Sequence, residues 1–275
     1  MAQGTSRDTS HDRLQQIVVT VSFVVCVIGS MIGVGVFGGT SVNAAAGGAL
    51  DTDATLLAPA SAAFSVWTVV YVGLAGYTVL QWFPAPTPEA RARQRRLRLP
   101  VAGTMLLNAA WILVVQAGWL WVSVLVIAAL LTLLVRVFLI LLRTRAHGLL
   151  DRVLVDGVLG IYLGWVCVAT AANIAAALTS AGFDGAGLAA DWWAVGVLAV
   201  VGVIGVVLAV RGNGPVAVAL AIAWGLSWIA VERWDGTPYS APTAAAALAA
   251  AVAVLGATLA VRLRAGSSQP AGGTR

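Results

Sequence analysis

Residues 59–82 read PASAAFSVWTVVYVGLAGYTVLQW, a stretch longer than the roughly 20 apolar residues that a helix needs to cross a bilayer. On a helix that advances about 100° per residue, one face carries the larger side chains Phe64, Trp67, Tyr71, Thr78 and Trp82. The other face carries Ala62, Gly73 and Gly76, and such small residues allow a neighbouring helix to approach closely. The stretch therefore predicts a membrane helix, whose aromatic face either packs against lipid and neighbours or lines a cavity.

The whole chain has the composition of a membrane protein. Of its 275 residues, 60% are hydrophobic and 10% are charged, whereas about a quarter of an ordinary globular chain is charged. The pI is near 10.0, but the arginines lie between apolar segments, where they set topology. Cys26 and Cys167 lie within apolar segments and form neither a disulfide framework nor a metal-binding spacing. We expect a multi-pass membrane protein that binds no nucleic acid.

The apolar segments predict an all-α fold with eight transmembrane helices. We expect these helices at residues 17–37, 59–83, 100–116, 119–142, 153–178, 192–210, 215–231 and 242–261. The first predicted helix carries two small-residue pairs with the spacing typical of close helix contact, Gly29/Gly33 and Gly35/Gly39. Residues 1–13 are polar, and we expect them to be disordered.

The distribution of arginine sets the expected orientation. If the N-terminus is cytoplasmic, Arg233 is the one arginine that falls in an outer loop. We therefore expect a plasma-membrane protein with both termini in the cytoplasm. The stretch EARARQRRLR at 89–98 holds five arginines, which either bind anionic lipid headgroups or act only as a topology signal; the second interpretation is the simpler. Arg136 is expected either to reach the cytoplasmic surface or to pair with Asp156.

The sequence contains no zinc motif, P-loop or nucleotide-binding glycine pattern, and we expect no catalytic residue. The informative residues are five tryptophans deep within the predicted helices: Trp67, Trp111, Trp165, Trp224 and Trp228. A buried indole N–H needs a hydrogen-bond partner, and Asn108 and Asn173 are candidates. These residues either hold helices together or line a cavity for a small molecule.

Three segments also resemble one known family, in the family's order. The spacing Phe64-x-x-Trp67-x-x-x-Tyr71 resembles the second helix of the tryptophan-rich sensory protein family (TspO, the translocator protein or peripheral-type benzodiazepine receptor). LLNAAW resembles its third helix and IYLGWVCVATAAN its fifth. The resemblance covers about residues 15–180 and implies a five-helix bundle that binds a hydrophobic, often planar ligand such as porphyrin, haem or sterol. It implies these ligand contacts: Phe64, Trp67, Tyr71, Asn108, Trp111, Tyr162, Trp165, Ala169 and Asn173.

The chain departs from the family pattern at several points. A single Pro59 opens the second helix where the family often has a pair, and Ile161 replaces the proline before the fifth-helix tyrosine. No tyrosine-to-basic cholesterol motif follows the fifth helix, so sterol binding of the animal type is not expected. The expected organisation is a cytoplasmic tail at 1–16, a TspO-like bundle at 17–180, three additional helices within 181–264 and a cytoplasmic tail at 265–275. The extra helices leave the oligomeric state open, a homo-oligomer included.

The expected function is that of a receptor or sensor in the lipid bilayer. Its ligand is expected to be a hydrophobic, tetrapyrrole-like molecule such as porphyrin or haem in a tryptophan-lined intramembrane pocket, with no metal site and no required cofactor. A small permease for such a molecule, and a structural or accessory membrane subunit without a small ligand, are the alternatives. Enzymatic action on porphyrin, claimed within the family, finds no acid–base group to support it here.

Overall fold

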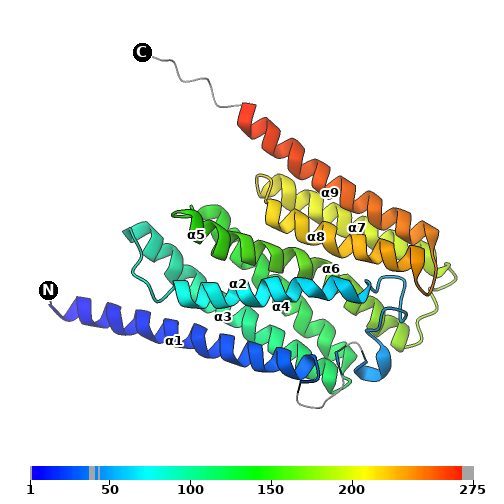
Figure 1. The fold of residues 1–275 in the computed structure, drawn as a ribbon, viewed down its shortest axis with the longest axis horizontal. Coiled ribbons are helices and arrows are strands. Elements are labelled where there is room, and N and C mark those ends of the chain that lie inside the picture. The colour runs from blue at the N-terminus through cyan, green and yellow to red at the C-terminus, as the bar shows by residue number, and fades with distance from the viewer. Residues whose placement is uncertain (1, 37–40, 43, 268–275) are drawn as a thin grey trace. The chain divides into compact units, whose positions relative to one another are not determined.

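The computed structural model describes residues 2–36, 41–42 and 44–267. Within these ranges, side chains are described for residues 10 to 265. This part of the chain is helical and contains no strand, and eight of its helical segments are long and apolar enough to cross a membrane (Figure 1). The predicted all-α fold with eight spans is therefore confirmed. The helices are α1 (Ala2–Gly33), α2 (Val66–Leu80), α3 (Pro88–Gln116), α4 (Leu120–Arg143), α5 (Leu149–Asp151), α6 (Val158–Ser180), α7 (Ala190–Arg211), α8 (Val216–Asp235) and α9 (Ala241–Ser267).

Shorter helical turns connect some of these helices. A π-helical turn, Arg152–Gly157, joins α5 to α6, and the 3-10 turns Ala46–Gly48 and Ser61–Ser65 precede α2. The predicted second span is therefore a 3-10 turn followed by an α-helix, and the predicted fifth span begins with a π-helical turn. Such π turns within longer helices are frequent at functional positions.

The first of two compact units contains Met1–Leu50 and Ser65–Leu159. Within it, α1 (blue in Figure 1) packs along α3. A Cβ added at Gly29 would lie 3.0 Å from the Ala109 Cβ, and one added at Gly33 would lie 2.9 Å from the Ile112 Cγ2. The close contact predicted from the Gly29/Gly33 spacing is confirmed, while Gly39 lies outside the described residues.

The small face of α2 also packs closely within this unit. A Cβ at Gly76 would lie 2.8 Å from the Leu154 Cδ2, and a Cβ at Gly73 would overlap the Val158 side chain. At Gly73 only glycine leaves room for this approach, so the small residues of α2 allow its backbone to lie against the π-helical turn and the first residue of α6. This arrangement confirms the neighbour predicted for the small face.

The second unit contains Asp51–Phe64 and the chain from Gly160 onward. Within it, α9 (orange to red in Figure 1) packs along both α7 and α8. A Cβ at Gly160 of α6 would lie 3.0 Å from the Ala217 Cβ, and one at Gly164 would lie 2.8 Å from the Ala221 Cβ, both on α8. Most of α6 therefore groups with the last three helices, and the expected organisation into a TspO-like bundle at 17–180 and three additional helices stays a prediction.

Two helices begin more than ten residues earlier than predicted. Helix α1 reaches back to Ala2, so the expected disorder is wrong for residues 2–13. Helix α3 begins at Pro88 rather than near residue 100 because Thr87 caps it: the Thr87 hydroxyl accepts a hydrogen bond from the Ala90 backbone N–H at 3.1 Å. Proline suits the first helical position, and alanine, arginine and glutamine favour helix. The arginine-rich stretch 89–98 is therefore helix, not loop.

Candidate functional site

The first aromatic group, defined as Trp67, Tyr71, Asn108 and Cys26, brings α1, α2 and α3 together in the first unit. Trp67 and Tyr71 lie one turn apart on α2, and their rings stack at 5.4 Å with an interplanar angle of 19°. Asn108 of α3 donates from Nδ2 to the Tyr71 hydroxyl at 2.9 Å and to the Cys26 sulfur at 3.6 Å. The structure therefore connects three residues predicted from sequence and adds Cys26.

Asn108 retains an unused hydrogen-bond acceptor in this group. The residue is 1% exposed, and its Oδ1 accepts no hydrogen bond from the residues that the structure describes. A buried polar atom without a partner costs about 1–3 kcal/mol, so this oxygen favours a donor from water or from a ligand. Trp111 follows Asn108 by three residues on α3 and is half-buried.

The second aromatic group, defined as Phe64, Trp165, Trp224 and Trp228, lies in the second unit. Phe64 meets Trp165 of α6 edge to face, at 5.7 Å and 75°. Trp224 and Trp228 of α8 meet in the same way, at 5.5 Å and 73°. Edge-to-face pairs of this kind contribute about 0.5–1.5 kcal/mol beyond the area that they bury. The remaining predicted residues of α6 are Tyr162 and Asn173, both buried, and Ala169, which is half-buried.

Trp224 and Trp228 fix the segment that carries Phe64. The Trp224 indole donates from Nε1 to the Ala63 carbonyl at 3.0 Å, and the Trp228 carbonyl accepts from the Ala60 N–H at 3.2 Å. The predicted ligand contacts omit both tryptophans because the family resemblance ends near residue 180. In the sequence, the one-turn spacing of Trp224 and Trp228 within an apolar helix is the signal that could have identified them.

Arg233 holds another part of the same segment. It belongs to the last turn of α8 and is 0% exposed, so its predicted place in a polar outer loop is wrong. Its Nη2 donates to the Thr52 carbonyl at 2.6 Å, and its Nη1 donates to the Pro238 carbonyl at 3.0 Å. A longer bond of 3.3 Å reaches the Thr237 carbonyl. A buried charged side chain without hydrogen-bond partners would be costly. The three backbone carbonyls provide these partners to the Arg233 guanidinium.

Asp156 pairs with Arg93 and not with Arg136. The predicted pairing of Arg136 with Asp156 is therefore wrong. The Arg93 guanidinium is 2% exposed, donates to Asp156 and lies 3.1 Å from the Asp151 carboxylate. Arg136 is exposed on α4. The extension of α3 to Pro88 accounts for the difference, because it brings an arginine of the presumed loop against the π-helical turn.

A third carboxylate, that of Asp12, binds two further arginines of α3. Asp12 of α1 accepts from Arg95 at 2.7 and 2.6 Å and from Arg98 at 2.8 Å. Three of the five arginines in residues 89–98 are therefore held by carboxylates. These contacts are structural: they bind α1, α3 and the π-helical turn together in the first unit.

Comparison with known proteins supplies the family. The family model described as TSPO-like protein matches residues 16–260. No curated protein and no solved structure matches the chain. The matched range contains both aromatic groups and extends past residue 180 through α7 and α8 into α9, beyond the segments that carry the sequence resemblance. With nearly all of its membrane-spanning part matched, the chain belongs to the TSPO-like protein family.

Proposed function

We propose that this membrane protein is a receptor or sensor that binds a hydrophobic, planar ligand of the porphyrin or haem class at its intramembrane tryptophans. The observation that carries the proposal is the buried Asn108 oxygen beside the stacked pair of Trp67 and Tyr71. Small-molecule sites combine apolar and aromatic walls with a few polar groups. The stacked rings offer a planar apolar surface, and the amide oxygen offers an acceptor to a ligand N–H or O–H.

The proposed activity is binding rather than catalysis. The polar groups of the first and second aromatic groups are an amide, a thiol, a phenol and indoles, which form hydrogen bonds but are uncharged at neutral pH. We propose no required cofactor and no metal. The proposal concerns the full chain in its bilayer, and a homo-oligomer is compatible with it.

Removing a tryptophan from either aromatic group is expected to weaken ligand binding. Trp67→Ala and Trp165→Ala should each weaken protoporphyrin binding by about 1–3 kcal/mol, the contribution of burying a large apolar side chain. Binding is measured with the full chain in nanodiscs, by quenching of tryptophan emission and by the change in the Soret band. Haem uptake into liposomes that contain the protein would indicate a permease instead.

Trp192→Ala is the matched control, because Trp192 is 66% exposed and lies outside both aromatic groups. Its binding constant should stay close to that of the unaltered protein. Equal weakening in all three variants, in step with their thermal stability, would show that the tryptophans serve packing only and would overturn the proposal.

We also propose that the protein lies in the plasma membrane with both termini in the cytoplasm, on the strength of the arginine asymmetry. In a Cys26→Ala, Cys167→Ala background, cysteines placed at the exposed positions Asp184 and Asp235 should react with an impermeant maleimide in whole cells. A cysteine at the exposed Arg145 should react only after lysis. The reverse labelling pattern would contradict this orientation.

A further inference from the structure

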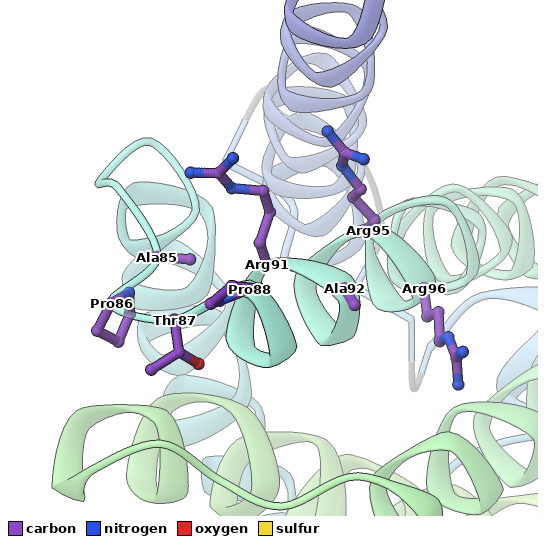
Figure 2. Close-up of a pocket in the computed structure, with 8 residues that line it drawn as sticks. All are labelled: Ala85, Pro86, Thr87, Pro88, Arg91, Ala92, Arg95 and Arg96. Atoms are coloured by element: carbon purple, nitrogen blue, oxygen red, sulfur yellow. The ribbon is translucent and has the colours of Figure 1, made fainter. Parts of the chain in front are cut away.

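The turn between α2 and α3 forms a pocket of about 550 Å³ (Figure 2). Eight residues of the first unit line it: Ala85, Pro86, Thr87, Pro88, Arg91, Ala92, Arg95 and Arg96. Three of these are arginines and none is acidic, so the pocket is built to receive negative charge. Its other lining residues are proline, alanine and one threonine, and none of them carries a charge.

The five arginines of residues 89–98 divide into paired and unpaired residues, and the pocket is lined by both unpaired ones and by one paired one, Arg95. Arg93, Arg95 and Arg98 are held by carboxylates. Arg91 and Arg96 are exposed, and neither forms an ion pair with a residue that the structure describes. A topology signal requires only positive charge near the membrane; it does not require that the two unpaired arginines of the stretch line one pocket.

The residue types that line the pocket suit a phosphate group. Figure 2 shows Arg91 and Arg95 extending from one side of α3 and Arg96 from the other, so the arginines flank the first turns of the helix. A guanidinium matches phosphate oxygens with two parallel hydrogen bonds. The pocket also includes the N-terminal turn of α3, whose helix dipole favours an anion. Glu89 lies in this turn but outside the pocket lining, and its one negative charge does not cancel those of Arg91 and Arg96.

The neighbouring residues place this pocket at the level of lipid headgroups. Trp82 and Phe83 directly follow α2 and are 48% and 62% exposed. Tryptophan side chains concentrate at the boundary between hydrocarbon and water. The pocket begins two residues later, at Ala85, and therefore lies just beyond the apolar part of α2.

We propose that this pocket binds the phosphate group of an anionic phospholipid. The proposal is independent of the ligand-binding function above, since it uses none of the residues of either aromatic group. It explains why Arg91 and Arg96 remain without carboxylate partners among the described residues while their three neighbours have them. The lipid would hold the α2–α3 turn against the membrane surface.

The test compares two double variants of the full chain. Arg91→Gln with Arg96→Gln removes the unpaired pocket charges, and Arg143→Gln with Arg145→Gln removes the same charge from exposed positions at and after the end of α4. Native mass spectrometry of the detergent-solubilised proteins measures binding of phosphatidylglycerol against phosphatidylcholine. Loss of a hydrogen bond to a charged group weakens binding by about tenfold or more, so the pocket variant should lose roughly 10- to 100-fold in phosphatidylglycerol affinity. The control variant should change by less than about threefold, because its arginines lie outside the pocket and detergent provides no anionic bilayer surface for them to contact.

The outcomes separate the pocket from general surface charge and from a soluble ligand. Equal losses in the two double variants, or no preference of the unaltered protein for phosphatidylglycerol, would overturn the proposal. Inorganic phosphate and glycerol 1-phosphate are titrated in phosphatidylcholine nanodiscs. If they bind to the unaltered protein but not to the pocket variant, and the protein shows no lipid preference, the site takes a soluble phosphate and the lipid assignment is wrong. Unchanged thermal unfolding of both variants confirms that they fold.

Discussion

Replacing Arg93 with methionine is expected to lower the free energy of unfolding by about 3–5 kcal/mol, the usual cost of removing one partner from a buried ion pair. The guanidinium is 2% exposed and lies between Asp151 and Asp156, whose side chains are 17% and 34% exposed. Without Arg93, the Asp151 and Asp156 carboxylates lose the guanidinium that lies between them. The partial exposure of Asp156 allows some hydration, so we expect a value near the lower end.

Arg91→Met is the matched control for this prediction. Arg91 lies two residues earlier on α3, is exposed and forms no ion pair with a described residue. Surface changes of this kind usually stay within about 0.5 kcal/mol. Unfolding is followed by helical circular dichroism during SDS titration in mixed micelles.

Neutralising the two carboxylates that Arg93→Met leaves unpaired, those of Asp151 and Asp156, should restore stability. Arg93→Met combined with Asp151→Asn and Asp156→Asn should recover much of the loss, because replacing all members of a buried ionic group can be nearly neutral. Similar destabilisation by Arg91→Met and Arg93→Met would show that the ion pairs contribute nothing specific.

The eight spans could be predicted because long apolar runs are a direct consequence of the bilayer's thickness. The start of α3 could not be found in that way, since hydropathy detects only the apolar part of a helix. Its true beginning depends on the cap at Thr87 and on the helix propensity of the arginine-rich stretch. Local sequence therefore held the information, in capping and propensity rather than in hydropathy.

Contacts between distant residues account for most of what the sequence could not show. The stack of Trp67 on Tyr71 follows from their one-turn spacing on α2. The bond from Asn108 to Tyr71 joins residues 37 positions apart, and the bond from Arg93 to Asp156 joins residues 63 positions apart. Residue spacing along one helix predicts which side chains share a face, but the partner on another helix depends on packing.

Replacing Arg233 with methionine is expected to destabilise the second unit by about 3 kcal/mol, since hydrogen bonds to a charged group contribute about 1.5–3 kcal/mol each and do not add fully. Methionine cannot donate these hydrogen bonds, so the carbonyls of Thr52, Thr237 and Pro238 lose their Arg233 donor. Arg233→Lys should recover only part of the stability, because an ammonium group lacks the planar fork that reaches several carbonyls at once. Arg211→Met, at an exposed position at the end of α7, is the control and should have little effect.

The effect of Arg233→Met should be concentrated in the segment before α2. Hydrogen exchange is expected to accelerate in residues 51–60, because the Thr52 contact is lost while Trp224 and Trp228 still hold Ala63 and Ala60. Exchange within α9 should change less. Since this segment leads into Phe64, which packs on Trp165, protoporphyrin binding should weaken together with the faster exchange. If exchange in residues 51–60 stays unchanged while stability falls, the α8 tryptophans alone hold the segment, and Arg233 acts only on the end of its own helix.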